Sequence, residues 1–498
     1  MKINNILLSF LSALILSGCT AKFEEMNVPP TSYSEIDPGI LFARAQRDGN
    51  FLQSYEYPDI VVGSWIQHWN SGFNLPASRY IFQPSSWNSM YTVIRNLSQI
   101  RNHLLKGKES DPAGRTKLAM AKIVEIDQWQ DITDMWGDIP FSESALGVDN
   151  LISQPKFDTQ ESIYKQLIND IDAAIANLTA GDQTFGSYDL FYNGDIEKWK
   201  KYGNAVKLQL GMRIKYADPA LSKSTVLAAL NGPIISGNGD NAMIKTFTNL
   251  PSSYHPVLAH FTGGSPDLKY LGETLINKLV TSADPRLPLI AAPTVNSVKA
   301  GTPMYVGKKA AQTDSEMTGI INDDYSLASK TTYFNLAIAN PIPWYVFTYA
   351  EICFYKAEIA LEGWAYTPDD VEKFYQEGIM AAMAQKPYDI TALPQAFKDN
   401  EFSLAGLTSE QKLEKIMTQK WIALFGRNYD AYSEWRRTGY PKLIPGTNQG
   451  STNGTIPRRF GYPSDESLLN EKNYLEAVGR MSNGDSYLSR VWWDKKAL

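Results

Sequence analysis

Several long segments of the chain repeat apolar residues at intervals of three and four, which limits the fold more than any other feature. Such intervals bring side chains onto one face of an α-helix. The segment 157–178 carries one face, made of Ile163, Leu167, Ile171, Ala174 and Leu178. The segment 195–216 carries another, made of Trp199, Tyr202, Val206, Leu210 and Ile214. Segments 348–364 and 408–426 follow the same pattern, so the fold is predicted to be mainly helical.

The predicted helices have recognisable ends and are separated by long polar loops. Gly363 and Gly426 stand where helices often finish with a left-handed residue. Asp158 and Glu161 resemble a capping box in which Asp replaces Ser or Thr. Loops rich in Gly, Pro, Asn and Ser cover 69–86, 232–267, 288–345 and 440–466. Loops of this length are usually functional or disordered, so they are the first place to look for a binding site.

The first residues are typical of an exported, lipid-anchored protein. Lys2 precedes an apolar run over residues 6–16, and small residues follow it, which is the order found in secretory signal peptides. The run is too short to span a bilayer as a helix. Leu16, Ser17, Gly18 and Cys19 together resemble the bacterial lipobox.

The lipobox resemblance implies cleavage before Cys19 and attachment of fatty acyl chains, such as palmitate, to that cysteine. The alternative is an ordinary signal peptide in which the cysteine is incidental. We expect a signal peptide at 1–18, a lipidated N-terminus and tether at 19–38, and a single large domain at 39–498.

Charge and histidine spacing argue against several functional classes. The net charge is −6 and the chain has no long basic run, which argues against binding to nucleic acid. The four histidines have no pair at the spacing of metal ligands on a helix, so no metal site and no cofactor are expected. Cys353 lies in an apolar pattern and is expected to be a small core residue.

Four aspartates recur at spacings of four, three and four, which places them on one side of a helix or at its end: Asp127, Asp131, Asp134 and Asp138. One functional interpretation is a pair of glycosidase carboxylates, and another is a cation site. The structural interpretation is a solvated acidic face, or carboxylates paired with arginines such as Arg436 and Arg437. We favour the structural interpretation because clustered buried carboxylates need cationic partners.

Aromatic and planar polar residues gather in two stretches that suit a sugar ligand, because sugars stack on flat rings and their paired hydroxyls bind planar polar groups. The candidates are Trp69, Asn70, Arg79, Tyr80 and Trp87 in the first stretch, with Tyr333 and Trp344 in the second. Trp65, His68 and Trp69 face one way if residues 60–69 are helical. The alternative is that these tryptophans anchor the core. Trp87 follows a loop with Pro84 and is expected at the surface.

Six motifs in a fixed order carry a family resemblance: "AKIVEIDQWQDITDMWGDIPFSESALG", "KFDTQESIYKQLINDID", "YNGDIEKWKKYGNAVKLQLGMRI", "SADPRLPLI", "YAEICFYKAEIALEGW" and "IMTQKWIALFGRNYDAYSEWRRTGYPKL". Their order, behind a lipobox, resembles the SusD/RagB outer-membrane lipoproteins of Bacteroidetes, and in particular the SusD-like branch with "WGDIP" and "EWRRTGYP". The resemblance extends from about residue 40 to Trp493. It implies tetratricopeptide-like helix pairs as a scaffold, with long ligand-binding loops.

The resemblance also implies a function and a partner. Members of the family bind nutrients, chiefly glycans, at the cell surface and cap a SusC-like TonB-dependent transporter of the outer membrane. We therefore expect a non-enzymatic lid that captures an oligosaccharide. A lid with a peptide ligand and a surface glycoside hydrolase are the alternatives. A hydrolase needs two carboxylates about 5–10 Å apart at a cleft, and the sequence offers carboxylates without a catalytic motif.

Overall fold

The computed structural model describes residues 36–55, 57–70, 80, 86–146, 152–249, 255–256, 270–330, 332, 341–447 and 452–496. The predicted signal peptide 1–18, most of the predicted tether 19–38, the predicted lipidation site Cys19 and the candidate ligand residues Arg79 and Tyr333 lie outside these residues.

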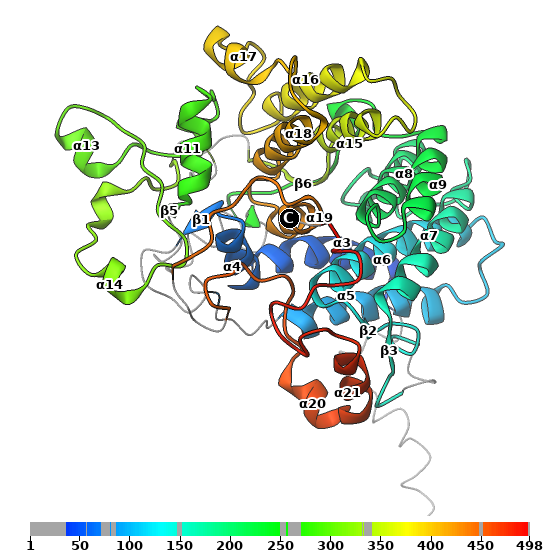
Figure 1. Ribbon diagram of the computed structural model, residues 1–498. Helices are drawn as coiled ribbons and strands as arrows, with labels where there is room; N and C mark the ends of the chain where they lie inside the picture. Colours follow the sequence, from blue (N-terminus) through cyan, green and yellow to red (C-terminus); the bar gives the residue numbers. More distant parts are fainter. Residues whose placement is uncertain are drawn as a thin grey trace, which may run out of the picture.

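The first half of the chain forms a row of packed helices (Figure 1). Their bounds are α3 (Pro38–Tyr55), α4 (Tyr57–Trp65), α5 (Ser86–Gln99), α6 (Arg115–Trp136), α7 (Gln160–Ala176), α8 (Ile196–Arg213) and α9 (Pro219–Asn231). A short π-helix, η2 (Ile100–Leu104), extends α5. Helices α6 to α9 pack each against the next, so consecutive helices form the scaffold.

The middle of the chain forms a lobe of short helices at the left of Figure 1. It contains α11 (Glu273–Thr281), α12 (Leu287–Ile290), α13 (Val295–Lys299) and α14 (Asp314–Met317). Single turns of 3₁₀-helix also occur, namely η4 (Gly186–Tyr188), η5 (Asn238–Asp240) and η7 (Asn322–Asp324). The predicted loop 288–345 thus contains short turns of helix at α13, α14 and η7.

The last part of the chain adds a second group of helices and returns to the first. Its helices are α15 (Tyr349–Leu361), α16 (Asp370–Met383), α17 (Gln395–Glu401), α18 (Ser409–Ala423), α19 (Asn428–Thr438), α20 (Ser464–Leu469) and α21 (Glu471–Gly479). Helices α15 and α16 pack together as a pair, and α19 packs on α4. The C-terminus lies at the centre of the view in Figure 1.

The strands are few and short among the described residues, and each pairs antiparallel with one other. β1 (Trp69–Asn70) pairs with β5 (Tyr270–Leu271), placing Trp69 opposite Leu271. β2 (Ile139–Pro140) pairs with β3 (Phe157–Asp158), and β4 (Ala242–Ile244) pairs with β6 (Trp344–Phe347). The prediction of a mainly helical single domain built from helix pairs with long connections is confirmed.

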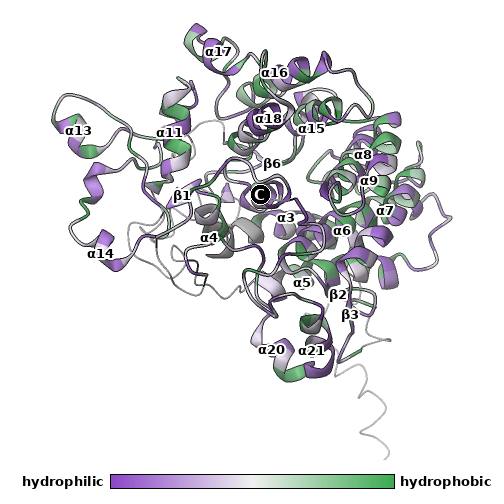
Figure 2. Ribbon diagram, viewed as in Figure 1, coloured by the Kyte–Doolittle hydropathy of each residue, from purple (hydrophilic) through white to green (hydrophobic). Residues whose placement is uncertain are grey.

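The predicted apolar faces are the ones that the fold buries. On α7 and α8, the side chains of Ile163, Leu167, Ile171, Trp199 and Tyr202 have no exposed surface. Each large apolar side chain that is fully buried contributes about 1.5–3 kcal/mol to folding. Figure 2 shows hydrophobic and hydrophilic residues alternating along these helices. Among the described residues, no helix combines the length and the apolar content that crossing a bilayer requires.

The helix ends agree with the sequence at the C-terminal side and differ at one N-terminus. Gly363 and Gly426 adopt φ values of +63° and +90°, as a left-handed ending requires. The predicted cap of α7 by Asp158 is wrong, because Thr159 is the N-cap and its hydroxyl accepts a hydrogen bond from the Ser162 amide. Asp158 instead accepts a hydrogen bond from the Ser142 amide at 2.7 Å.

A buried network of charges joins the two groups of helices. Arg213 on α8 bridges Asp134 on α6 and Glu434 on α19, each at 3.0 Å. Arg437 on α19 contacts Glu434 and Glu358, each at 2.7 Å. The charges neutralise one another away from water, so the loss of one partner would strand another.

Candidate ligand-binding site

The first candidate stretch begins at β1, which is fixed to the middle lobe. The Asn70 amide donates a hydrogen bond to the Lys308 carbonyl at 3.0 Å and another to the Lys309 carbonyl. The Trp69 ring lies against Phe425, with the ring centroids 4.6 Å apart. Trp69 and Asn70 are both 4 % exposed. The predicted pair therefore lies beneath the surface, where it holds the start of the stretch in place.

His68 connects the same stretch to α18. Its Nε2 donates a hydrogen bond to the Trp421 carbonyl at 3.0 Å, and the Trp421 indole donates one to the Ile66 carbonyl at 3.0 Å. Burial lowers the pKa of His68 to about 3, although its hydrogen bonds with Asn428 and Trp421 act in the opposite direction. The imidazole is therefore neutral and structural. The predicted helix ends at Trp65, so Trp65, His68 and Trp69 do not share a helical face.

Tyr80 and Trp344 are also buried. Tyr80 has no exposed surface, and burial raises the pKa of its hydroxyl despite a hydrogen bond with the Gly446 backbone. Trp344 belongs to β6, is 7 % exposed, and lies 5.4 Å from the His255 ring and 6.4 Å from the Phe51 ring between centroids. Burial lowers the pKa of His255 to about 3, so this imidazole is neutral as well.

Trp87 is in a different aromatic cluster, and the prediction that it lies at the surface is wrong. It is 5 % exposed, and its ring centroid lies 5.0 Å from that of Trp136 and 4.9 Å from that of Tyr91. Its indole N–H also donates a hydrogen bond to the Glu466 carboxylate on α20. Its position at the first turn of α5 turns the ring toward α6, because that face of α5 is the buried one.

A desolvated lysine lies beside β1. Lys308 is 1 % exposed, and burial lowers its pKa to about 8. Its ammonium nitrogen lies 5.1 Å from the Tyr270 ring centre and 5.7 Å from that of Tyr325, within range of a cation–π interaction. The Lys308 carbonyl holds Asn70. Sequence reasoning did not single out Lys308, Phe425 or His255, because each lies far along the chain from the residues that it contacts.

The row of aspartates is explained by partners within the fold. Asp134 pairs with Arg213, and its backbone carbonyl accepts a hydrogen bond from Arg436 at 2.6 Å. Asp138 pairs with Arg480 at 2.6 Å. Burial raises the pKa of Asp127 to about 7, and the Tyr202 hydroxyl donates a hydrogen bond to it at 2.8 Å. For Asp134 and Asp138 the structural interpretation is confirmed, with Arg213 as the ionic partner of Asp134 in place of Arg436 or Arg437.

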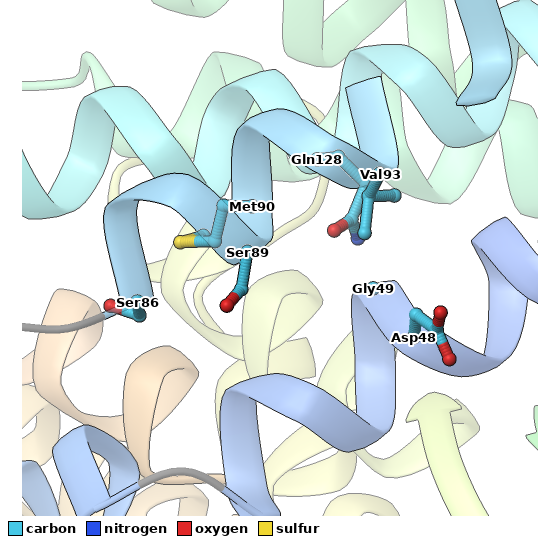
Figure 3. A pocket seen from close by; sticks show the side chains of 7 residues that line it. All are labelled: Asp48, Gly49, Ser86, Ser89, Met90, Val93 and Gln128. Carbon is cyan, nitrogen blue, oxygen red and sulfur yellow. The ribbon is translucent and has the colours of Figure 1, made fainter. Parts of the chain in front are cut away.

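A crevice between α3 and α5 is a packing gap. Asp48 and Gly49 on α3 face Ser86, Met90 and Val93 on α5 across it, with Gln128 of α6 at one end (Figure 3). It has no room for the centre of a water molecule. The helices approach closely here because Gly49 has no side chain, and a Cβ at that position would lie 2.6 Å from the Gln128 side-chain oxygen. We therefore place no ligand in it.

Comparisons with known proteins agree with this architecture. Residues 30–463 match a family model, SusD-like, described as "Starch-binding associating with outer membrane". Among solved structures, a chitin-binding protein is 30% identical, with a TM-score of 0.77, and the match covers 92% of this chain and 100% of that one. A SusD homolog from Bacteroides fragilis is 23% identical with a TM-score of 0.79, over 92% and 100% of the two chains.

A chitin-binding SusD homolog from Flavobacterium johnsoniae is 24% identical with a TM-score of 0.75, over 92% of this chain and 98% of that one. At these lower identities the likeness is one of fold. No functionally curated protein matches the chain.

Proposed function

Because the chain belongs to the SusD-like family, described as starch-binding and associating with the outer membrane, we propose that it binds a glycan at the cell surface. The observation that carries the proposal is the family match over residues 30–463, together with 30% identity to a chitin-binding protein along that protein's full length. The ligand is an oligosaccharide, and the protein holds it without breaking a bond.

We further propose that the protein delivers the oligosaccharide to a SusC-like TonB-dependent transporter and acts as its lid. Lipid on Cys19 would anchor it to the outer membrane, facing outward. A lid needs a flexible attachment on which to open and close. The polar, proline-containing sequence 20–38 supports that role as a tether.

The glycan is proposed to bind at the two candidate stretches, between their buried anchors. Trp69 and Asn70 hold the beginning of the first stretch, and the buried Tyr80 holds it again directly after Arg79. Trp344 holds the end of the second through β6. Direct contact with the sugar then falls to residues between the anchors, and Arg79 and Tyr333 have the required chemistry, a planar cation for paired hydroxyls and a ring for stacking. Trp87 belongs to the core and has no place in this site.

The proposal separates contact residues from anchors in a mutational test. Arg79→Ala and Tyr333→Ala should each lower the affinity for the bound oligosaccharide by about tenfold or more, a loss of about 1.4 kcal/mol, without lowering the Tm. Trp69→Ala and Trp344→Ala should lower the Tm, because truncating a core tryptophan costs about 3–5 kcal/mol. Calorimetry against chitin, starch and other plant and microbial oligosaccharides gives the affinities, and thermal melting gives the stabilities.

The same incubations decide between binding and hydrolysis. A binding protein leaves the oligosaccharide intact, whereas a glycoside hydrolase generates new reducing ends. New reducing ends that persist after purification to homogeneity would overturn the proposal. Binding of peptides with no binding of any oligosaccharide would assign the protein to the alternative class of peptide-binding lids.

A further inference from the structure

A second cavity lies away from β1 and the middle lobe, and it has the size of a ligand site. Its volume is about 620 Å³, within the range of about 300–1,000 Å³ usual for small-molecule sites. One wall is the end of α6 with the first residues of α7, and the other is the segment that follows α21, residues 480–495. In Figure 1, α7 and α21 lie well apart from β1 and β5.

The acidic residues of this cavity have cationic partners of their own. Asp138 pairs with Arg480 at 2.6 Å and also accepts a hydrogen bond from the Gln160 amide at the start of α7. Glu161 pairs with Lys165 at 2.5 Å. Asp494 accepts a hydrogen bond from Arg458 at 2.8 Å. Each of these carboxylates is therefore paired with a cation, and two of those cations, Lys165 and Arg458, do not line the cavity.

The basic residues of the cavity are only partly compensated. Arg480 forms an ion pair with Asp138, and Arg459 forms one with Asp485 at 2.5 Å. Arg490 is exposed, donates a hydrogen bond to the Lys496 carbonyl at 2.9 Å and lies 3.6 Å from Asp494, a carboxylate that it shares with Arg458. Lys495 is exposed, and no ion pair holds it among the described residues. The mouth of the cavity is therefore positive, with two cations available to a ligand.

An aromatic side chain lies between these two cations in the chain. Trp492 lines the cavity and is half-buried, with its ring centroid 6.1 Å from that of Tyr164, which supports it from the core. Ser482 and Asn483, from the same segment 480–495, add exposed polar groups to the lining. A flat ring, neutral hydrogen-bonding groups and two solvent-exposed cations are the functional groups that an acidic sugar needs.

We propose that this cavity binds an acidic saccharide, with a sugar ring against Trp492 and its carboxylate or sulfate between Arg490 and Lys495. The ring buries its C–H face on the indole, and the two cations receive the charge. A neutral sugar would leave both cations solvated and gain only the stacking contact. This site is independent of the oligosaccharide site proposed above, and the failure of one leaves the other standing.

Calorimetry on the full-length mature protein tests the proposal with two anionic probes, trigalacturonate for carboxylate and a heparin tetrasaccharide for sulfate, and with maltotriose as the neutral probe. We expect at least one anionic probe to bind, and its affinity to fall as the salt concentration rises. The double substitution Arg490→Gln with Lys495→Gln should weaken that binding about tenfold or more, and Trp492→Leu should do likewise.

Matched variants keep the result interpretable. Arg95→Gln with Lys223→Gln removes the same charge from exposed positions on α5 and α9, and it should leave the affinity unchanged. Thermal melting confirms that each variant is folded. Affinity for the neutral ligand of the other site should stay the same in the double variant, which separates the two proposals.

Three outcomes would overturn the inference. The first is that neither anionic probe binds. The second is that an anionic probe binds equally well to the Arg490/Lys495 double variant. The third is that a hexaglutamate peptide binds as tightly as the sugar and that Trp492→Leu leaves the affinity for the sugar unchanged. The last result would assign the cavity to acidic peptides.

Discussion

At the scale of single residues, Trp87 shows how burial changes the meaning of an aromatic residue. Its ring packs on Trp136 and Tyr91 at 5 % exposure. We expect Trp87→Ala to destabilise the protein by about 3–5 kcal/mol through the cavity it leaves, and to keep the affinity for oligosaccharide. Urea unfolding and calorimetry measure the two quantities. Trp87→Phe, which retains a ring, is the control and should lose less stability. A stable Trp87→Ala variant that no longer binds sugar would return Trp87 to the ligand site.

The buried carboxylate of Glu358 gives the protein an acid-sensitive core. Burial alone would raise its pKa, but the charges of Arg437 and Lys215 outweigh burial and lower the pKa to about 2. A carboxylate whose pKa is lowered by folding stabilises the native state above its unfolded pKa of about 4.3. That contribution is lost as the pH falls from about 4.3 toward 2.

Glu358→Gln should therefore destabilise the protein by about 3–5 kcal/mol at pH 7, because it removes the buried carboxylate that Arg437 and Lys215 share and leaves each with one acidic partner fewer. The stability difference between variant and wild type should shrink as the pH falls toward 2. Unfolding by urea at a series of pH values measures it. Glu161→Gln removes an exposed carboxylate paired with Lys165, and its effect should be within about 1 kcal/mol. A Glu358→Gln deficit that stays constant with pH would contradict the assignment.

The sequence predicts that a buried carboxylate has a cationic partner, or that a helix has an N-cap, better than it predicts which residue fills that role. The aspartate row called for cations, and Asp134 has one, but the partner is Arg213 of α8 and not Arg436 or Arg437. Likewise, the sequence predicts Asp158 as the N-cap of α7, and the N-cap is the next residue, Thr159. Desolvation of a charge is a local cost that the sequence reveals, whereas the identity of the partner depends on packing between distant helices.

At the scale of elements, the contact of α4 with α19 depends on a glycine. A Cβ at Gly63 would lie 2.5 Å from the Trp69 ring and 3.0 Å from the Asn428 amide. Gly63→Ala should therefore destabilise the protein by about 1–3 kcal/mol through overpacking. Gly479 at the end of α21 is the matched control, because nothing lies within 4 Å of a Cβ added there. Thermal melting of both variants should give a lower Tm for the first only, and equal Tm values would mean that α4 and α19 move apart freely.

Helix existence and helix faces could be predicted at this scale, and aromatic burial could not. The buried faces of α7 and α8 follow from intervals of three and four, which are local. The ring partners of Trp65 are Tyr432 and Phe460, each with centroids 5.5 Å away. Those residues follow it by several hundred positions in the chain, so no local pattern distinguishes a tryptophan of the core from one of a binding surface.

At the scale of the whole molecule, the proposed lid requires an anchor in the outer membrane and a transporter to which it binds. Cys19→Ala should release the protein from the outer membrane, because several acyl chains hold a protein where a single chain binds only weakly. Fractionation and lipid labelling measure this.

The tagged wild-type protein, extracted in mild detergent, should co-purify with one large TonB-dependent barrel protein. Membrane retention of Cys19→Ala would contradict the anchor, and repeated recovery of the wild-type protein alone would contradict the lid.

The hydrogen bond between Trp421 and Ile66 joins positions 355 residues apart, and that between Trp493 and Asp134 joins positions 359 apart. Contacts of such high order close last, because the entropy of the intervening chain opposes them. Trp65 of α4 therefore lacks its ring partners Tyr432 and Phe460, and Asp134 lacks the Trp493 indole, until almost all residues have been made. A chain released early would expose Trp65 and leave Asp134 without its hydrogen bond from Trp493, and exposed apolar surface of this kind favours aggregation. The chain is thus most prone to aggregate before its final segment has been added.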